Sequence, residues 1–157
     1  LLALLDKNIK SVAVTVSPTE EQLEQIHTLG FDYVQIHGKI SEKLLSECKT
    51  PVIRAINVNG IESIDDIENL DNVKGILFDS AVPGSGKSFD WSMLEKLPKN
   101  QKMLFLAGGL TADNVAKAVA QLRPFAVDVS SGVELADKSG KDFELVRTFI
   151  ENARNSK

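Results

Sequence analysis

Short apolar segments that favour strands alternate with amphipathic segments along most of the chain. The strand-like segments are residues 11–16, 33–37, 51–58, 75–79, 103–107 and 126–129. The helix-like segments are residues 18–29, 41–48, 61–69, 91–96, 112–121 and 141–152. Nearly continuous apolar strands separated by helices are typical of a parallel sheet that helices cover. The pattern therefore predicts an α/β fold built from βα units.

Several helix boundaries are marked by residues that favour them. Ser17 and Glu20 have the spacing of a capping box at the start of the first helix, and Gly30 follows that helix as a stop signal. Ser41 and Thr111 precede later helix-like segments, which predicts that both are N-caps.

The periodicity is compatible with two architectures. The first residues of successive predicted strands are 18 to 28 residues apart, close to the length of one βα unit. A (β/α)₈ barrel needs eight such units, so about two would be absent, and residues 1–7 read as the tail of a preceding helix. An open doubly wound sheet would need no further unit.

Composition narrows the class of protein. The chain has 157 residues, of which 43% are hydrophobic and 25% charged, and these values are typical of one globular domain. A net charge of −4 argues against a nucleic-acid-binding surface, and no apolar run approaches the length of a membrane span. The single cysteine, Cys48, excludes an internal disulfide and a multi-cysteine metal site. We therefore expect a cytoplasmic protein that binds neither nucleic acid nor membrane.

Polar residues and glycines are concentrated where the predicted strands end. They are His37, Gly38, Asp79, Gly108, Gly109, Asp128, Ser130, Ser131 and Gly132. Ligands of α/β proteins bind outside the carboxyl ends of the strands, so we expect these residues to converge on one site.

The loops after the last two strands carry an anion-binding pattern. Gly108–Gly109 follows one strand and Ser130–Gly132 follows the other. Glycines let backbone N–H groups approach a phosphate, and barrels often bind phosphate with their last two loops. The alternative is that these glycines only form turns.

Charged residues near the strands have two interpretations each. Asp79 is a candidate general acid or base, because a partly desolvated carboxyl group keeps its proton more readily, or else it is a turn residue. Asp128 either accepts hydrogen bonds from ligand hydroxyls or organises the backbone. Arg54 lies in an apolar strand and is either a structural ion-pair partner, which we favour slightly, or part of the site floor. Cys48 falls late in a helix and is predicted to pack rather than react.

One segment imitates a nucleotide-binding motif. Residues 81–88, Ala-Val-Pro-Gly-Ser-Gly-Lys-Ser, match a P-loop if alanine replaces the first glycine. The sequence that follows offers no clear nucleotide-binding helix and no obvious acidic strand to hold magnesium. We therefore disfavour a nucleotide-binding module.

Taken together, these segments resemble the phosphoribosylanthranilate isomerase family of tryptophan biosynthesis. The matching strings, in family order, are Val-Gln-Ile-His-Gly at 34–38, Val-Ile-Arg-Ala-Ile at 52–56, Leu-Phe-Asp at 77–79, Gly-Ser-Gly-Lys-Ser-Phe-Asp-Trp at 84–91, Leu-Ala-Gly-Gly-Leu at 106–110 and Arg-Pro-Phe-Ala-Val-Asp-Val-Ser-Ser-Gly-Val-Glu at 123–134. The resemblance implies a (β/α)₈ barrel, represented here by its third to eighth units. Residues 1–157 would then form one N-terminally incomplete domain.

The resemblance also implies a reaction. Family members catalyse an Amadori rearrangement of N-(5-phosphoribosyl)anthranilate without a metal or organic cofactor, and they occur as monomers or homodimers. Asp79 would be the general acid. The implied substrate- or phosphate-binding residues are His37, Arg54, Gly84, Gly86, Gly108, Gly109, Asp128, Ser130, Ser131 and Gly132.

Two family features have no counterpart in this sequence. The family's general base is the cysteine of a first strand ending in Lys-Ile-Cys-Gly, which Cys48 does not match, and an arginine that meets the anthranilate carboxylate is also missing. Arg54 stands where the family usually has lysine. We therefore expect these 157 residues alone to be inactive. The alternatives are another phosphate-binding barrel enzyme and the relaxed P-loop module.

Overall fold

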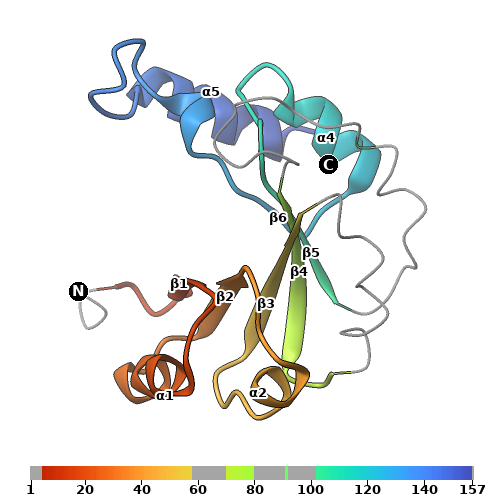
Figure 1. Cartoon of the computed structure of the whole chain (residues 1–157). Helices are drawn as coiled ribbons and strands as arrows, with labels where there is room; N and C mark the ends of the chain where they lie inside the picture. The colour runs from red at the N-terminus through yellow and green to blue at the C-terminus, as the bar shows by residue number, and fades with distance from the viewer. Residues whose placement is uncertain (1–4, 58–69, 80–90, 92–101, 157) are drawn as a thin grey trace. The chain divides into compact units, whose positions relative to one another are not determined.

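The computed structural model describes residues 5–57, 70–79, 91 and 102–156 (Figure 1). The chain divides into two compact units. The first comprises Leu1–Ile56 and Gly60–Leu77, and the second comprises Asn57–Asn59 and Phe78–Lys157.

In its described residues, the first unit is an α/β arrangement of parallel strands and two helices. In chain order its elements are β1 (Val12–Val16), α1 (Glu20–Leu29), β2 (Tyr33–His37), α2 (Glu42–Ser46), β3 (Val52–Asn57) and the greater part of β4 (Val73–Asp79). β1 pairs with β2 in parallel, with Val12 opposite Tyr33, and β2 pairs with β3 in parallel, with Val34 opposite Val52. The strands lie in chain order, as successive βα units require.

The core of the first unit forms between these strands and helices. Val34 and Ile36 of β2 are completely buried, and Leu23 of α1 and Leu45 of α2 are buried with them. β1 differs from the expected pattern because Val12, Val14 and Val16 are all exposed. Side chains alternate between faces along a strand, so one face of β1 is uncovered among the described residues.

The start of α1 corrects a sequence-based prediction. Thr19, not Ser17, is the N-cap, and it forms a capping box with Gln22. Ser17 instead adopts a left-handed backbone conformation at φ 48° and ties the end of β1 to the end of β2. Its N–H donates to the His37 carbonyl at 2.9 Å, and its Oγ accepts from the Lys39 N–H at 2.9 Å. The predicted end at Gly30 is confirmed, with φ 77°.

Apart from Asn57–Asn59, the second unit starts with Phe78 and Asp79, the last two residues of β4. It continues with β5 (Met103–Leu106), α4 (Val115–Leu122), β6 (Ala126–Val127), the short 3₁₀ helix η4 (Ser131–Val133) and α5 (Phe143–Arg154). β5 and β6 pair in parallel, with Phe105 opposite Ala126. The strands follow the order β4, β5, β6.

Helices α4 and α5 lie side by side in the second unit (Figure 1). Val115 and Ala118 of α4 and Phe149 of α5 are buried, and the Asn152 side chain donates to the Ala112 carbonyl at 2.8 Å. The predicted N-cap at Thr111 is wrong, because α4 starts after Asn114. Ser41 is the N-cap of α2, as predicted.

The α/β class predicted from the alternating pattern is confirmed for the described residues. The predicted helix at 61–69, residues 92–96 of the predicted helix at 91–96 and residue 58 of the predicted third strand lie outside them. No helix in the described ranges is both long enough and apolar enough to cross a membrane.

The start of β1 is fixed by the carboxylate of Asp32, which precedes β2. Oδ1 accepts from Lys10 Nζ at 2.8 Å, and Oδ2 accepts from both the N–H and the Oγ of Ser11 at 2.9 Å. The Lys10 ammonium and the two Ser11 donors hold the pKa of Asp32 down to about 2. These bonds favour the ionised carboxylate and therefore the folded state wherever Asp32 is charged.

We expect Asp32→Asn to destabilise the protein at pH 7 and to have a smaller effect in acid. An unfolded aspartate titrates near pH 4, so the stabilisation is complete above about pH 4 and disappears as the pH falls toward 2. Urea unfolding of both proteins at several pH values measures the difference. A difference in unfolding free energy that stays constant from neutral pH down to about pH 3 would contradict the assignment.

Candidate active site

Three polar strand ends lie next to one another in the second unit. The Phe78 carbonyl of β4 accepts from the Ala107 N–H at 2.8 Å, and the Leu106 carbonyl of β5 accepts from the Asp128 N–H at 2.8 Å. These bonds hold Asp79, the loop that begins at Ala107, and Asp128 at the ends of successive strands. Asp79 is partly buried and Asp128 is exposed. A carboxyl group therefore ends β4 beside the glycine loop, and a second one follows β6.

The glycine loop after β5 is shaped by its two glycines and by Asn114. Gly108 and Gly109 have φ values of 76° and 68°, in the left-handed region that favours glycine. The Asn114 side chain donates to the Gly109 carbonyl at 2.9 Å and accepts from the Thr111 N–H at 2.8 Å. Because this amide fixes the Gly109 carbonyl, it also fixes the direction of the loop. Sequence reasoning gave Asn114 no function of its own and therefore missed this one.

The loop after β6 packs against the glycine loop through Gly132. A side chain at Gly132 would collide with the Leu110 carbonyl oxygen and would lie 3.2 Å from Thr111 Cα. Only glycine therefore allows the two backbones to approach this closely. Ser131 and Gly132 are the first residues of η4, and helix N-termini leave N–H groups without helical partners.

The two loops together present a group of unused backbone donors. Within the described residues, the N–H groups of Gly108, Gly109, Ser131 and Gly132 donate no hydrogen bond. Unused N–H groups on neighbouring loops can bind an anion, because each carries a partial positive charge. The predicted anion-binding residues of the last two strands are thus neighbours in the structure.

Lys141 supports the second loop from eleven residues further along the chain. Its ammonium donates to Ser130 O at 2.9 Å, Ser130 Oγ at 3.2 Å and Glu134 Oε1 at 3.0 Å. An antiparallel bridge between Glu134 and Lys141 brings the lysine back to the loop. Sequence reasoning missed Lys141, since a lysine in a polar turn carries no local signal of such a contact.

The first unit has its own polar strand ends, at β2 and β3. Arg54 Nη1 donates to the carbonyls of Ile36 at 2.6 Å and Ala55 at 2.9 Å, and Nη2 donates to the Gly38 carbonyl. No carboxylate pairs with Arg54 among the residues with described positions, so the favoured ion-pair role finds no partner there. Burial lowers the pKa of the guanidinium. Arg54 is thus held by strand-end carbonyls.

His37 lies at the end of β2 and is partly buried. Its Nε2 is 2.8 Å from Gln35 Nε2, two residues earlier on the same face of the strand. Gly38 follows in the left-handed region at φ 69°, with Ser17 packed against it.

Cys48 does not follow the carboxyl end of any described strand. It follows the end of α2, is buried, and donates from Sγ to the Thr50 carbonyl at 3.4 Å. Burial raises the pKa of its thiol, which is the opposite of what a thiolate base requires. Its environment agrees with the predicted packing role. Gly84 and Gly86, together with the P-loop-like segment, lie outside the described residues.

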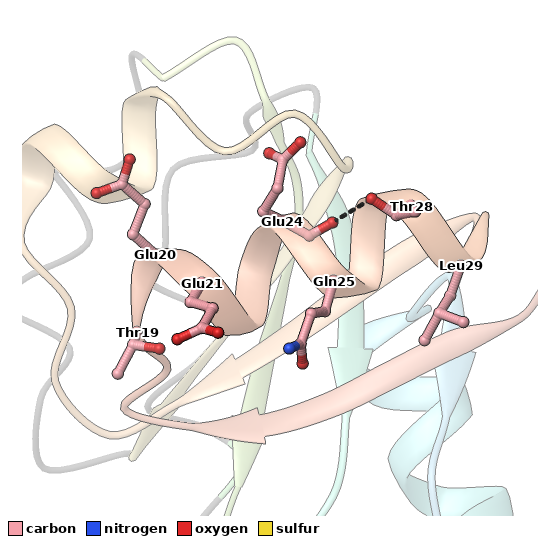
Figure 2. A pocket seen from close by; sticks show the side chains of 7 residues that line it. All are labelled: Thr19, Glu20, Glu21, Glu24, Gln25, Thr28 and Leu29. Carbon is pink, nitrogen blue, oxygen red and sulfur yellow. Dashed lines mark hydrogen bonds between the residues drawn. The ribbon is translucent and has the colours of Figure 1, made fainter.

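A shallow hollow along α1 is a poor site for a phosphate ester. Seven residues of this helix and its N-cap line it: Thr19, Glu20, Glu21, Glu24, Gln25, Thr28 and Leu29 (Figure 2). Its three glutamates would repel an anionic ligand. None of the predicted site residues lines it, so the anion-binding geometry remains that of the second unit.

Comparison with known proteins identifies the family. Residues 4–152 match the family model described as N-(5'-phosphoribosyl)anthranilate (PRA) isomerase. The N-(5'-phosphoribosyl)anthranilate isomerase of Streptococcus mutans serotype c is 40% identical over 156 residues, which cover 98% of this chain and 77% of that protein.

Solved structures agree with the sequence comparison. Phosphoribosyl anthranilate isomerase from Thermotoga maritima superposes with a TM-score of 0.82 at 34% identity, covering 98% of this chain and 77% of that one. A phosphoribosyl anthranilate isomerase in complex with reduced 1-(o-carboxyphenylamino)-1-deoxyribulose 5-phosphate gives 0.79 at 31% identity, covering 98% and 75%. The chain therefore belongs to the N-(5'-phosphoribosyl)anthranilate isomerase family, whose pattern its strand ends carry.

Proposed function

We propose that this protein converts N-(5-phosphoribosyl)anthranilate into 1-(2-carboxyphenylamino)-1-deoxyribulose 5-phosphate. Because the chain belongs to this family, it is an isomerase of tryptophan biosynthesis that acts on a small molecule. The proposal rests mainly on one observation. Asp79 and the two loops with unused N–H groups lie at neighbouring strand ends of the same compact unit. A phosphorylated sugar that must be opened by an acid needs both features.

Asp79 acts as the general acid of the first step. Its carboxyl group donates a proton to the furanose ring oxygen, the C1–O bond breaks, and the nitrogen lone pair forms a Schiff base at C1. A base then removes the C2 proton, and the electron pair gives an enolamine that tautomerises to the ketone. The sum is an isomerisation in which no atom is gained or lost. The position of Asp79 at a strand end, partly buried, supports this role because it limits competition from water.

The phosphate is held by the two loops of the second unit. The N–H groups of Gly108, Gly109, Ser131 and Gly132 supply donors, and Asp128 accepts hydrogen bonds from the sugar hydroxyls. Fixing the phosphate anchors the substrate at a distance from the reacting carbon, which positions the ring oxygen for proton transfer. Arg54 and His37 are assigned to substrate binding from the first unit's strand ends.

We also assign the βα units of this chain to the third to eighth units of a (β/α)₈ barrel. The chain covers 77% of the Streptococcus mutans relative, and its matching strings follow the family order. In this assignment β5 and β6 are the seventh and eighth strands. Their loops are then the pair that most often binds phosphate in such barrels.

We expect the whole protein that contains this sequence to consume N-(5-phosphoribosyl)anthranilate and to restore growth of a tryptophan auxotroph that lacks this isomerase. Substrate fluorescence and product analysis measure the reaction. The Streptococcus mutans relative, assayed in parallel, shows that the substrate preparation is competent. A folded protein that leaves the substrate unchanged while the relative consumes it would overturn the proposal.

A further inference from the structure

The phosphate-binding loops proposed above contain no cationic side chain of their own. Their donors are backbone N–H groups, and the residues at the loop tips are glycines and serines. A phosphate dianion carries nearly two negative charges, so a nearby cation would strengthen its binding. In the second unit, the side chain of Lys141 supplies a cation that bonds to the second of these loops.

The ammonium of Lys141 has all three of its protons engaged. Two bonds go to the carbonyl and the hydroxyl oxygen of Ser130, and the third goes to Glu134. A saturated ammonium has no donor left for the ligand. Lys141 therefore acts through Ser130, the residue immediately before the N–H groups of Ser131 and Gly132.

The bond to the Ser130 hydroxyl determines what that hydroxyl can do. Its oxygen accepts from Lys141, so its own proton is directed away from the lysine. A hydroxyl that accepts a charge-assisted hydrogen bond is also a stronger donor. Ser130 is exposed, so the hydroxyl proton remains accessible to a ligand.

Glu134 keeps the lysine in this position. The Lys141–Glu134 pair is partly exposed, with side chains 45% and 28% accessible, and such pairs add little to stability. The backbone bridge between the same two residues and the bond from the Asp142 N–H to the Val133 carbonyl at 2.9 Å fix the turn that carries them. The ion pair itself therefore adds little to stability, and it keeps the ammonium within reach of Ser130.

We propose that Lys141 is a positioning residue of the phosphate site, orienting and polarising Ser130 for a phosphate ester without touching it. The inference rests on the proposed function, because it requires that the two loops bind phosphate. The inference extends the phosphate site by one residue that lies outside both loops. The contacts run from Glu134 to Lys141 and from Lys141 to Ser130.

The test compares Lys141→Met, Lys141→Arg and Lys138→Met with the unsubstituted whole protein. Lys138 is the matched control, since it lies in the same turn and its ammonium makes no hydrogen bond within the described residues. We expect Lys141→Met to raise KM and the inhibition constant of inorganic phosphate by about tenfold, equivalent to one hydrogen bond to a charged group. The kcat should change little, Lys141→Arg should recover part of the loss, and Lys138→Met should match the original.

Three outcomes would overturn the inference. The first is an unchanged KM and phosphate inhibition constant in Lys141→Met. The second is an equal loss in Lys138→Met, which would indicate a general effect of charge. The third is a lower Tm without loss of phosphate affinity, which would assign Lys141 to the stability of its turn. If the unsubstituted protein neither turns over the substrate nor binds phosphate, the proposed function itself fails.

Discussion

Asp79→Asn should lower kcat by about a thousandfold, within the range that general acid catalysis contributes. Asparagine keeps the shape of the side chain and its place at the end of β4, but it has no proton to give to the ring oxygen. The substrate and its phosphate meet the same loops as before, so KM should change little. Steady-state fluorescence of the whole protein gives both constants.

The matched control is Asp71→Asn. Asp71 lies just before the opposite end of β4, is exposed, and makes no side-chain hydrogen bond within the described residues. The same loss of charge there should leave kcat unchanged. Binding of the reduced ribulose phosphate analogue, followed by calorimetry, should be retained in both variants. A kcat for Asp79→Asn close to that of Asp71→Asn would remove Asp79 from the role of acid.

Strand positions were predictable because their signal is local. The predicted strand at 33–37 coincides with β2, where branched and aromatic residues end at a His-Gly pair. Gly30 was equally predictable as a helix end. The residue after a helix often needs a positive φ, and glycine meets that need by itself, without help from distant contacts. The same local logic put Asp79 and Asp128 at strand ends, where β4 and β6 finish in the structure.

The start of α1 was not predictable, because two capping patterns of equal spacing overlap in the sequence. Ser17 with Glu20 and Thr19 with Gln22 both fit the capping box. The choice is made by tertiary contacts, since Ser17 bonds to His37 and Lys39, about twenty residues away. Tertiary contacts also explain two further gaps. Lys141 was missed, and the contact of Gly132 with the glycine loop was not foreseen, because in both cases the partner lies in another loop.

The exposed valines of β1 have a different cause. Val14 and Val16 read as core residues in a sequence of apolar strands, yet they are 64% and 74% exposed. β1 is the first strand in the order, and among the described residues it pairs with β2 alone. Hydrophobicity indicates that a residue can be buried, but whether something covers it depends on neighbours that a local pattern does not contain.

Gly132→Ala should weaken binding of phosphorylated ligands by about a hundredfold, roughly the loss of one or two hydrogen bonds to a charged group. The added methyl group would meet the Leu110 carbonyl, so the loop after β6 must move away from the glycine loop. The N–H groups of Ser131 and Gly132 would move with it, away from the glycine loop that Gly132 now contacts. We expect KM for the substrate and Kd for the reduced analogue to rise together.

Gly140→Ala provides the matched control, because a methyl group there would meet only Leu135 Cδ1 at 3.9 Å. This substitution adds the same atom within the same unit and should leave Kd and Tm nearly unchanged. If Gly132→Ala fails to fold, Gly109→Ala tests the same site through its positive φ, which an alanine adopts at a cost of about 1 kcal/mol. Normal affinity for phosphorylated ligands in a folded Gly132→Ala protein would contradict a site made by the two loops. Loss of affinity in that variant, with Gly140→Ala unaffected, would show that phosphate binding depends on the close approach that glycine alone permits.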